Sequence, residues 1–116
     1  MTTQPEAADY VVICKASDIA PGGSKMLMAD GGPWRRKPMA VFNDNGTFYV
    51  TNYLCPHMGG PLSDGTMENG VVTCPWHAWT FDARTGEELR ASGHDITVYA
   101  TTVEGGEVRV GTAKKR

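Results

Sequence analysis

Two short segments constrain this chain more than any other part of its sequence: residues 55–60, CPHMGG, and residues 74–79, CPWHAW. Each segment supplies one cysteine and one histidine, and sixteen residues separate His57 from Cys74. Thiolates are soft ligands suited to zinc and iron–sulfur centres, and imidazole suits iron and zinc. A fold that uses this chemistry has to bring both segments to one place.

Short β-prone runs, separated by turns rich in glycine and proline, make up most of the remaining sequence. No window repeats apolar residues at the helical period of about 3.6, so no amphipathic helix is predicted. The pattern predicts an all-β fold, an antiparallel sandwich or small barrel. We expect strands at residues 10–15, 25–28, 39–42, 47–51, 71–73, 79–81, 96–102 and 108–110, with hairpin turns at 43–46, 82–86 and 104–106.

Length and charge exclude several classes of protein. A chain of 116 residues fits a single domain over 1–116, and a net charge of -2 gives no reason to expect nucleic acid or an anionic membrane as partner. The N-terminus lacks the basic and apolar regions of a signal peptide. The longest apolar run, residues 11–14, is too short to cross a membrane. We therefore expect a cytoplasmic protein, with flexible tails at 1–8 and 112–116.

The chain has three cysteines, and an odd number in a reducing compartment argues against a disulfide framework. Cys14 lies in an apolar run without a partner motif, so we expect a buried structural thiol. Three interpretations fit the other two cysteines and their neighbouring histidines: a [2Fe–2S] cluster with mixed ligands, a tetrahedral zinc site, or buried residues without a metal. Zinc signatures usually pair Cys with Cys and His with His, whereas each segment here holds one of each, which favours two distinct irons.

The two segments resemble the cluster-binding motifs of the Rieske family, and the similarity extends through CPHMGGPLSDG and VVTCPWHAWTFDARTGE. The resemblance implies one [2Fe–2S] cluster per chain. It implies that Cys55 and Cys74 are the thiolate ligands and that His57 and His77 are the imidazole ligands. It also implies a Rieske-type fold, with a cluster-binding subdomain at about 53–81 whose two loops lie at one tip.

Departures from the family pattern indicate the branch. Rieske proteins of respiratory cytochrome bc complexes carry an extra cysteine in each loop, and these two form a disulfide; here Gly60 and Trp76 take those places. The same proteins carry a serine and a tyrosine whose hydroxyls donate hydrogen bonds to sulfur, where this chain has Trp79 and Phe81. Without those donors we expect a midpoint potential near the low end of the Rieske range, about −150 mV rather than about +300 mV.

In its expected low potential, its small size and its expected lack of a membrane anchor, this chain resembles the ferredoxins of bacterial aromatic-ring dioxygenase systems. That resemblance implies a one-electron carrier, not an enzyme, since the sequence contains no mononuclear-iron catalytic domain. Its partners would be a flavin-dependent NADH reductase and a terminal oxygenase. We expect a monomer that docks near His57, Met58, Trp76 and His77.

Two other functions fit the sequence. The first is the small Rieske-like subunit of a larger oxidoreductase, such as an NADH-dependent nitrite reductase, although many such subunits have lost ligands and all four are present here. The second is a structural zinc-binding module, which would be colourless where a Rieske protein is red-brown.

Residues beside the proposed ligands have expected roles as well. Pro56 and Pro75 would stiffen the loops through their fixed φ. Gly59 and Gly60 would let backbone amides approach the cluster, and Trp79 would serve ordinary packing. Many family members cover the cluster with a proline-rich loop, but no proline follows Pro75, so what covers the cluster stays open. His94 is expected in a surface loop.

Overall fold

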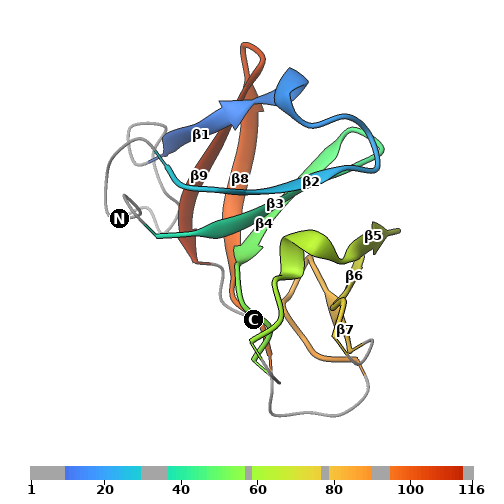
Figure 1. The fold of residues 1–116 in the computed structure, drawn as a ribbon. Helices are drawn as coiled ribbons and strands as arrows, with labels where there is room; N and C mark the ends of the chain where they lie inside the picture. The colour runs from blue at the N-terminus through green and yellow to red at the C-terminus, as the bar shows by residue number, and fades with distance from the viewer. Residues whose placement is uncertain (1–9, 30–36, 57–58, 77–78, 90–94, 114–116) are drawn as a thin grey trace.

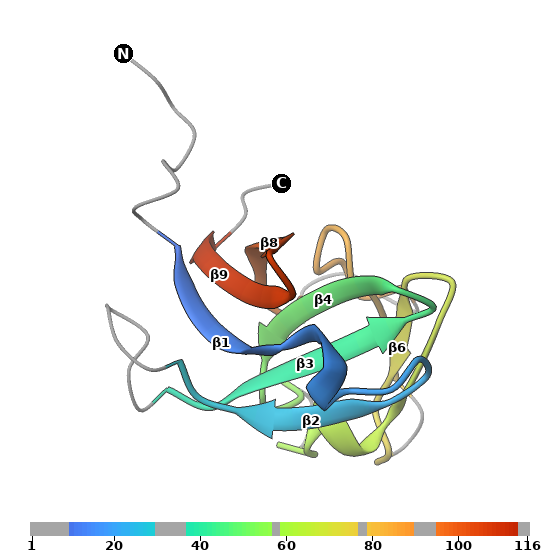
Figure 2. The same cartoon turned by 90° about the horizontal axis from the view of Figure 1, so that it is seen from above.

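The computed structural model describes residues 10–29, 37–56, 59–76, 79–89 and 95–113. These residues form two antiparallel sheets (Figure 1). A six-stranded sheet has the order β1-β9-β8-β4-β3-β2 and is strongly curled (Figure 2), and a three-stranded sheet has the order β5-β6-β7. The prediction of an all-β antiparallel fold is confirmed. In the described part of the chain, no helix is long and apolar enough to cross a membrane.

All the expected strands are present, and a further strand, β5, was not predicted. Most ends lie within two residues of the predicted ones. The last strand, however, runs on to Ala113, so residues 112 and 113 belong to the sheet rather than to the expected tail. The strands are β1 (Val11–Lys15), β2 (Ser24–Leu27), β3 (Met39–Asp44), β4 (Thr47–Asn52), β5 (Thr66–Glu68), β6 (Val71–Thr73), β7 (Thr80–Asp82), β8 (Val98–Glu104) and β9 (Glu107–Ala113).

Three hairpins close through two-residue turns in which both residues have positive φ. Asn45–Gly46 joins β3 to β4 with φ of 54° and 97°, and Asn69–Gly70 joins β5 to β6 with φ of 53° and 78°. Gly105–Gly106 joins β8 to β9 in the same way. Such turns match the right-handed twist of the flanking strands and favour asparagine and glycine, the residues that most readily adopt positive φ. The turn predicted at 82–86 is also present, and beyond it Glu88 forms a single bridge back to Phe81.

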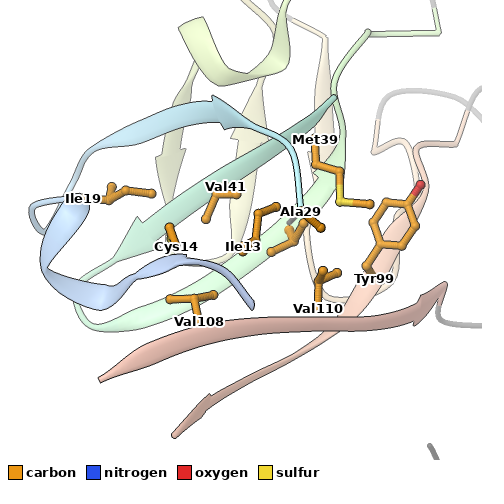
Figure 3. Packing of buried hydrophobic residues seen from close by; sticks show 10 residues of the cluster. Ile13, Cys14, Ile19, Ala29, Met39, Val41, Tyr99, Val108 and Val110 are labelled. Atoms are coloured by element: carbon orange, nitrogen blue, oxygen red, sulfur yellow. The ribbon is translucent and has the colours of Figure 1, made fainter. Parts of the chain in front are cut away.

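Strand β3 is buried on both of its faces, and it forms a wall shared by two hydrophobic cores. Side chains alternate along a strand, so Met39 and Val41 face the first core while Ala40 and Phe42 face the second. The first core fills the inside of the curled sheet (Figure 3). Its buried residues are Ile13, Cys14, Ile19, Ala29, Met39, Val41, Val50, Tyr99, Val108 and Val110.

The second core joins the two sheets. It combines apolar side chains of β3 and β8 with Leu62, Val72 of β6 and Phe81 of β7, all of them buried. Cys55 and Cys74 belong to this core as well. The loops that carry the two cysteines are therefore anchored by the same packing that holds the small sheet against the large one.

Asn52, at the end of β4, links the segment that leaves the large sheet after β4 to the segment that returns to it before β8. Its backbone N–H donates to the Thr97 carbonyl at 3.0 Å, and its Oδ1 accepts from the Thr97 N–H at 2.8 Å. Its Nδ2 donates to the carbonyl of Leu54, the residue before Cys55, at 2.5 Å. The side chain of Asn52 thus holds both segments that connect the large sheet to the small one.

Replacing Asn52 by alanine should destabilise the protein by about 1–2 kcal/mol, because the Thr97 N–H and the Leu54 carbonyl each lose a partner. Urea unfolding of the purified protein measures the change. Asn45→Gly is the matched control, since this asparagine of the same hairpin lies in a turn that glycine also adopts. Equal stability losses in the two variants would show that the Asn52 bonds contribute nothing specific.

Candidate metal centre

The first loop, Cys55–Gly60, is the tip of a short hairpin-like excursion between the two sheets. Leu62 donates its N–H to the Tyr53 carbonyl, and Leu54 and Pro61 form an antiparallel bridge. The Cys55 N–H then donates to the Gly60 carbonyl at 2.8 Å. The loop starts at a cysteine whose backbone is already fixed by strand-like pairing.

The second loop, Cys74–Trp79, is the tip of the hairpin formed by β6 and β7. Thr73 pairs with Thr80 across the hairpin, and the Cys74 N–H donates to the Trp79 carbonyl at 2.8 Å. Both loops therefore close in the same way, with the cysteine amide bonded to the carbonyl five residues further on. Each cysteine occupies the last paired position before its loop.

The structure brings the two cysteine side chains together at the edge of the second core. Cys55 and Cys74 are each only 2% exposed, and their thiols lie within hydrogen-bonding reach of one another. The Cys74 sulfur also accepts the N–H of Trp76 at 3.4 Å. Two converging sulfurs with a backbone donor aimed at one of them are suited to bind a soft metal.

Burial raises the pKa of the Cys74 thiol above its usual value; the Trp76 N–H opposes this rise and the adjacent Cys55 thiol adds to it. The buried Cys74 thiol therefore holds its proton unless a cation compensates the negative charge. A metal centre provides that compensation, and its binding releases the proton. The arrangement favours a metal site over a reactive Cys74 thiolate.

The other candidate residues divide into those the structure describes and those it does not. His57, Met58, His77 and His94 lie outside the described residues. Trp79 is partly buried and packs against the second core, which confirms its packing role. Gly59 has a φ of 77°, and its N–H donates to the Cys55 carbonyl at 2.8 Å, so this amide closes the loop. The approach of the Gly59 and Gly60 backbone to a cluster stays a prediction.

Cys14 lies in the first core, apart from the other two cysteines (Figure 3). Burial raises the pKa of its thiol to about 11, with a further rise caused by Asp18 that Lys25 partly opposes. The prediction of a buried structural thiol is confirmed.

Sequence reasoning missed two residues that shape the site. Asn52 holds Leu54, the neighbour of Cys55, through its side chain. Leu54 itself is 51% exposed, so it presents an apolar surface beside the first loop. Neither residue belongs to a recognisable motif, and only the positions of the surrounding strands reveal what they contact.

The sequence model of the Rieske [2Fe–2S] domain matches residues 9–100. The ferredoxin component of the p-cumate 2,3-dioxygenase system of Pseudomonas putida is 32% identical over 107 residues, 90% of this chain and 87% of the relative. Ferredoxin CarAc of Metapseudomonas resinovorans is 33% identical over 109 residues, 91% of this chain and 96% of the relative.

Solved structures agree with the sequence comparisons. The complex of reduced oxygenase and oxidized ferredoxin in carbazole 1,9a-dioxygenase contains a chain that matches with a TM-score of 0.76 and 31% identity, over 93% of this chain and 98% of that one. A putative NADH-dependent nitrite reductase small subunit from Mycobacterium tuberculosis matches with a TM-score of 0.74 over 92% of this chain and 96% of that one. At 22% identity, the second similarity shows a shared fold alone.

This chain therefore belongs to the Rieske [2Fe–2S] domain family. The family carries one [2Fe–2S] cluster, and the two buried, adjacent thiols fit the cysteine half of its ligand set. Within the family, the chain is a ferredoxin, an electron carrier rather than a catalyst.

Single cysteine substitutions should distinguish the buried pair of thiols from Cys14. The Cys74→Ala variant should purify without iron or inorganic sulfide, because one sulfur of the buried pair is lost. The Cys14→Ala variant should keep its full content of iron and sulfide, since Cys14 packs only in the first core. Chemical iron and sulfide assays check this, and iron loss in Cys14→Ala with retention in Cys74→Ala would contradict the assignment.

Proposed function

We propose that Cys55 and Cys74 bind one iron of the cluster and that His57 and His77 bind the other. The observation that carries this proposal is the pair of buried thiols held side by side by two loops of identical closure. His57 lies two residues after Cys55, and His77 lies three residues after Cys74, so each histidine belongs to a loop whose base is fixed. When bound, the cluster accepts and releases a single electron.

The protein's own residues set the conditions for that electron exchange. The second core excludes water from the cysteine side of the site, and the Trp76 N–H bonds to the Cys74 sulfur. Outer groups of this kind orient ligands and tune the potential of a metal centre. The fixed loop bases limit how far the ligands can move between oxidation states.

The proposed role is to carry electrons, one at a time, from a flavin-dependent NADH reductase to a terminal aromatic-ring oxygenase. Support comes from relatives of matching length that serve as ferredoxin components of dioxygenase systems. Support also comes from the solved carbazole complex, in which a similar ferredoxin is found with its oxygenase.

Docking is proposed on the face that surrounds the two loops, near His57, Met58, Trp76 and His77. Trp76 is 48% exposed, and the exposed Leu54 precedes the first loop. Exposed apolar side chains beside a redox centre supply contact area for a partner without adding charge. The alternative role, a nitrite reductase small subunit, would instead require stable co-purification with a large subunit.

Electron paramagnetic resonance of the dithionite-reduced protein tests the ligand set. The spectrum should be that of a mixed histidine–cysteine [2Fe–2S] cluster and not of an all-cysteine cluster. His57→Ala and His77→Ala should each abolish it, because each removes one ligand of the same iron. His94→Ala is the matched control and should leave the spectrum intact. An unchanged spectrum and iron content in His57→Ala or His77→Ala would overturn the assignment.

The midpoint potential should lie near −150 mV, at the low end of the Rieske range. The physical reason is that Trp79 and Phe81 have no hydroxyl to donate to sulfur, so the added negative charge of the reduced cluster is less stabilised. Protein-film voltammetry measures the potential directly. A midpoint above about +100 mV would show that other donors replace the missing hydroxyls.

A further inference from the structure

Gly60 lies at the point where the two loops touch. A Cβ added at Gly60 would lie 2.9 Å from the sulfur of Cys74, 3.0 Å from Cγ of Trp76 and 3.1 Å from its Cδ2. The backbone of the first loop therefore packs directly against the indole and the sulfur of the second loop. No side chain larger than hydrogen fits at Gly60 unless one of them moves.

The requirement for glycine at this position is one of space and not of backbone conformation. Gly60 does not have a positive φ, whereas its neighbour Gly59 has a φ of 77°. A Cβ at Gly59 would meet nothing within 4 Å. The two adjacent glycines thus serve separate purposes: Gly59 forms the turn, and Gly60 receives the neighbouring loop.

Trp76 contributes to the site twice, through its ring and through its backbone. Its indole covers the Cα of Gly60, and its N–H donates to the Cys74 sulfur at 3.4 Å. Holding the ring against Gly60 restricts rotation of residue 76, which keeps the N–H aimed at the sulfur. The side chain is 48% exposed, so the indole separates this part of the site from solvent.

We propose that the Gly60–Trp76 contact is the device that locks the two cluster loops together and shields the Cys74 sulfur from water. Trp76 is a positioning residue in this proposal, acting through Cys74. The proposal rests on the proposed function in one respect, namely that Cys74 is a cluster ligand. The loop contact and the ligand set are otherwise independent, because four ligands could bind a cluster without any contact between Gly60 and Trp76.

The contact matters because a cluster is lost when one of its ligands leaves the metal. A loop free to move away from its partner opens a path for water or a chelator to replace a ligand. A half-buried aromatic ring across the loop junction opposes that movement through its packing. The lifetime of the cluster should therefore depend on the ring and on the space that Gly60 leaves for it.

The experiment compares Trp76→Ala, Trp76→Phe, Gly60→Ala and Gly59→Ala with the unaltered protein. Cluster loss is followed anaerobically, in the presence of a strong iron chelator, by the decay of visible absorbance. Trp76→Ala should lose its cluster about tenfold faster, equivalent to about 1.4 kcal/mol. Trp76→Phe should stay within about twofold of the unaltered protein, because a flat ring still covers Gly60.

Gly60→Ala should match or exceed the loss in Trp76→Ala, and a folded Gly60→Ala protein isolated without iron counts as the same result. Gly59→Ala places an equal methyl group on the adjacent residue, in open space. It should keep the cluster lifetime even if its positive φ lowers the unfolding temperature. The glycine pair thus separates a contact at the site from a general loss of stability.

The electron paramagnetic resonance spectrum of the reduced protein provides a readout that a merely structural role of Trp76 would not change. Trp76→Ala should shift the g values, since the N–H on the Cys74 sulfur is released, and Trp76→Phe should restore them. Equal cluster lifetimes in Trp76→Ala and the unaltered protein, or equal losses in Gly59→Ala and Gly60→Ala, would overturn the proposal. Absence of a mixed-ligand spectrum in the unaltered protein would instead overturn the ligand assignment.

Discussion

The burial of β3 on both faces is the constraint on which the rest of the molecule depends. Met39 and Val41 complete the core of the curled sheet, and Ala40 and Phe42 begin the core that holds the small sheet. Because Cys55 and Cys74 belong to that second core, the thiols of the proposed metal site are fixed by hydrophobic packing and not by exposed loops. A polar substitution in β3 would leave a buried group without a partner and would disturb both cores at once.

Two loops of different sequence are closed at their bases by the same backbone hydrogen bond. In each, the cysteine amide donates to the carbonyl five residues on, at 2.8 Å. A backbone bond at the loop base fixes the Cα of the cysteine, so only its side-chain torsion remains to be set. The surrounding core restricts that torsion as well. A metal centre that changes its charge benefits from ligands whose backbone and side chain are both fixed. Electron exchange is fast when the ligand atoms move little between the two oxidation states.

The parts of this structure that follow from local chemistry could be predicted, and those that follow from tertiary packing could not. Asn45–Gly46 was recognised as a turn because both residues tolerate positive φ. Strand β5 was missed although Asn69–Gly70 gives the same signal, because Thr66–Glu68 is short and has little strand propensity without β6 beside it. Asn52 contacts a residue 45 positions away, which no local pattern encodes. Gly59 and Gly60 look alike in sequence, and they differ only in the folded chain, where Gly59 has a positive φ and Gly60 lies against the Cys74 sulfur and the Trp76 indole.

Both cysteine loops lie at the same end of the molecule (Figure 1). Under the proposed function, the electron donor and the electron acceptor therefore need the same face of the carrier, so they bind in turn and each must leave quickly. Rapid exchange requires a small contact area, as in other electron-transfer encounters. Leu54 and Trp76, each about half exposed, fit that requirement: the buried half of Trp76 holds the loops together, and the exposed half remains for a partner. One side chain can thus serve both cluster retention and docking, because the two roles use different parts of its surface.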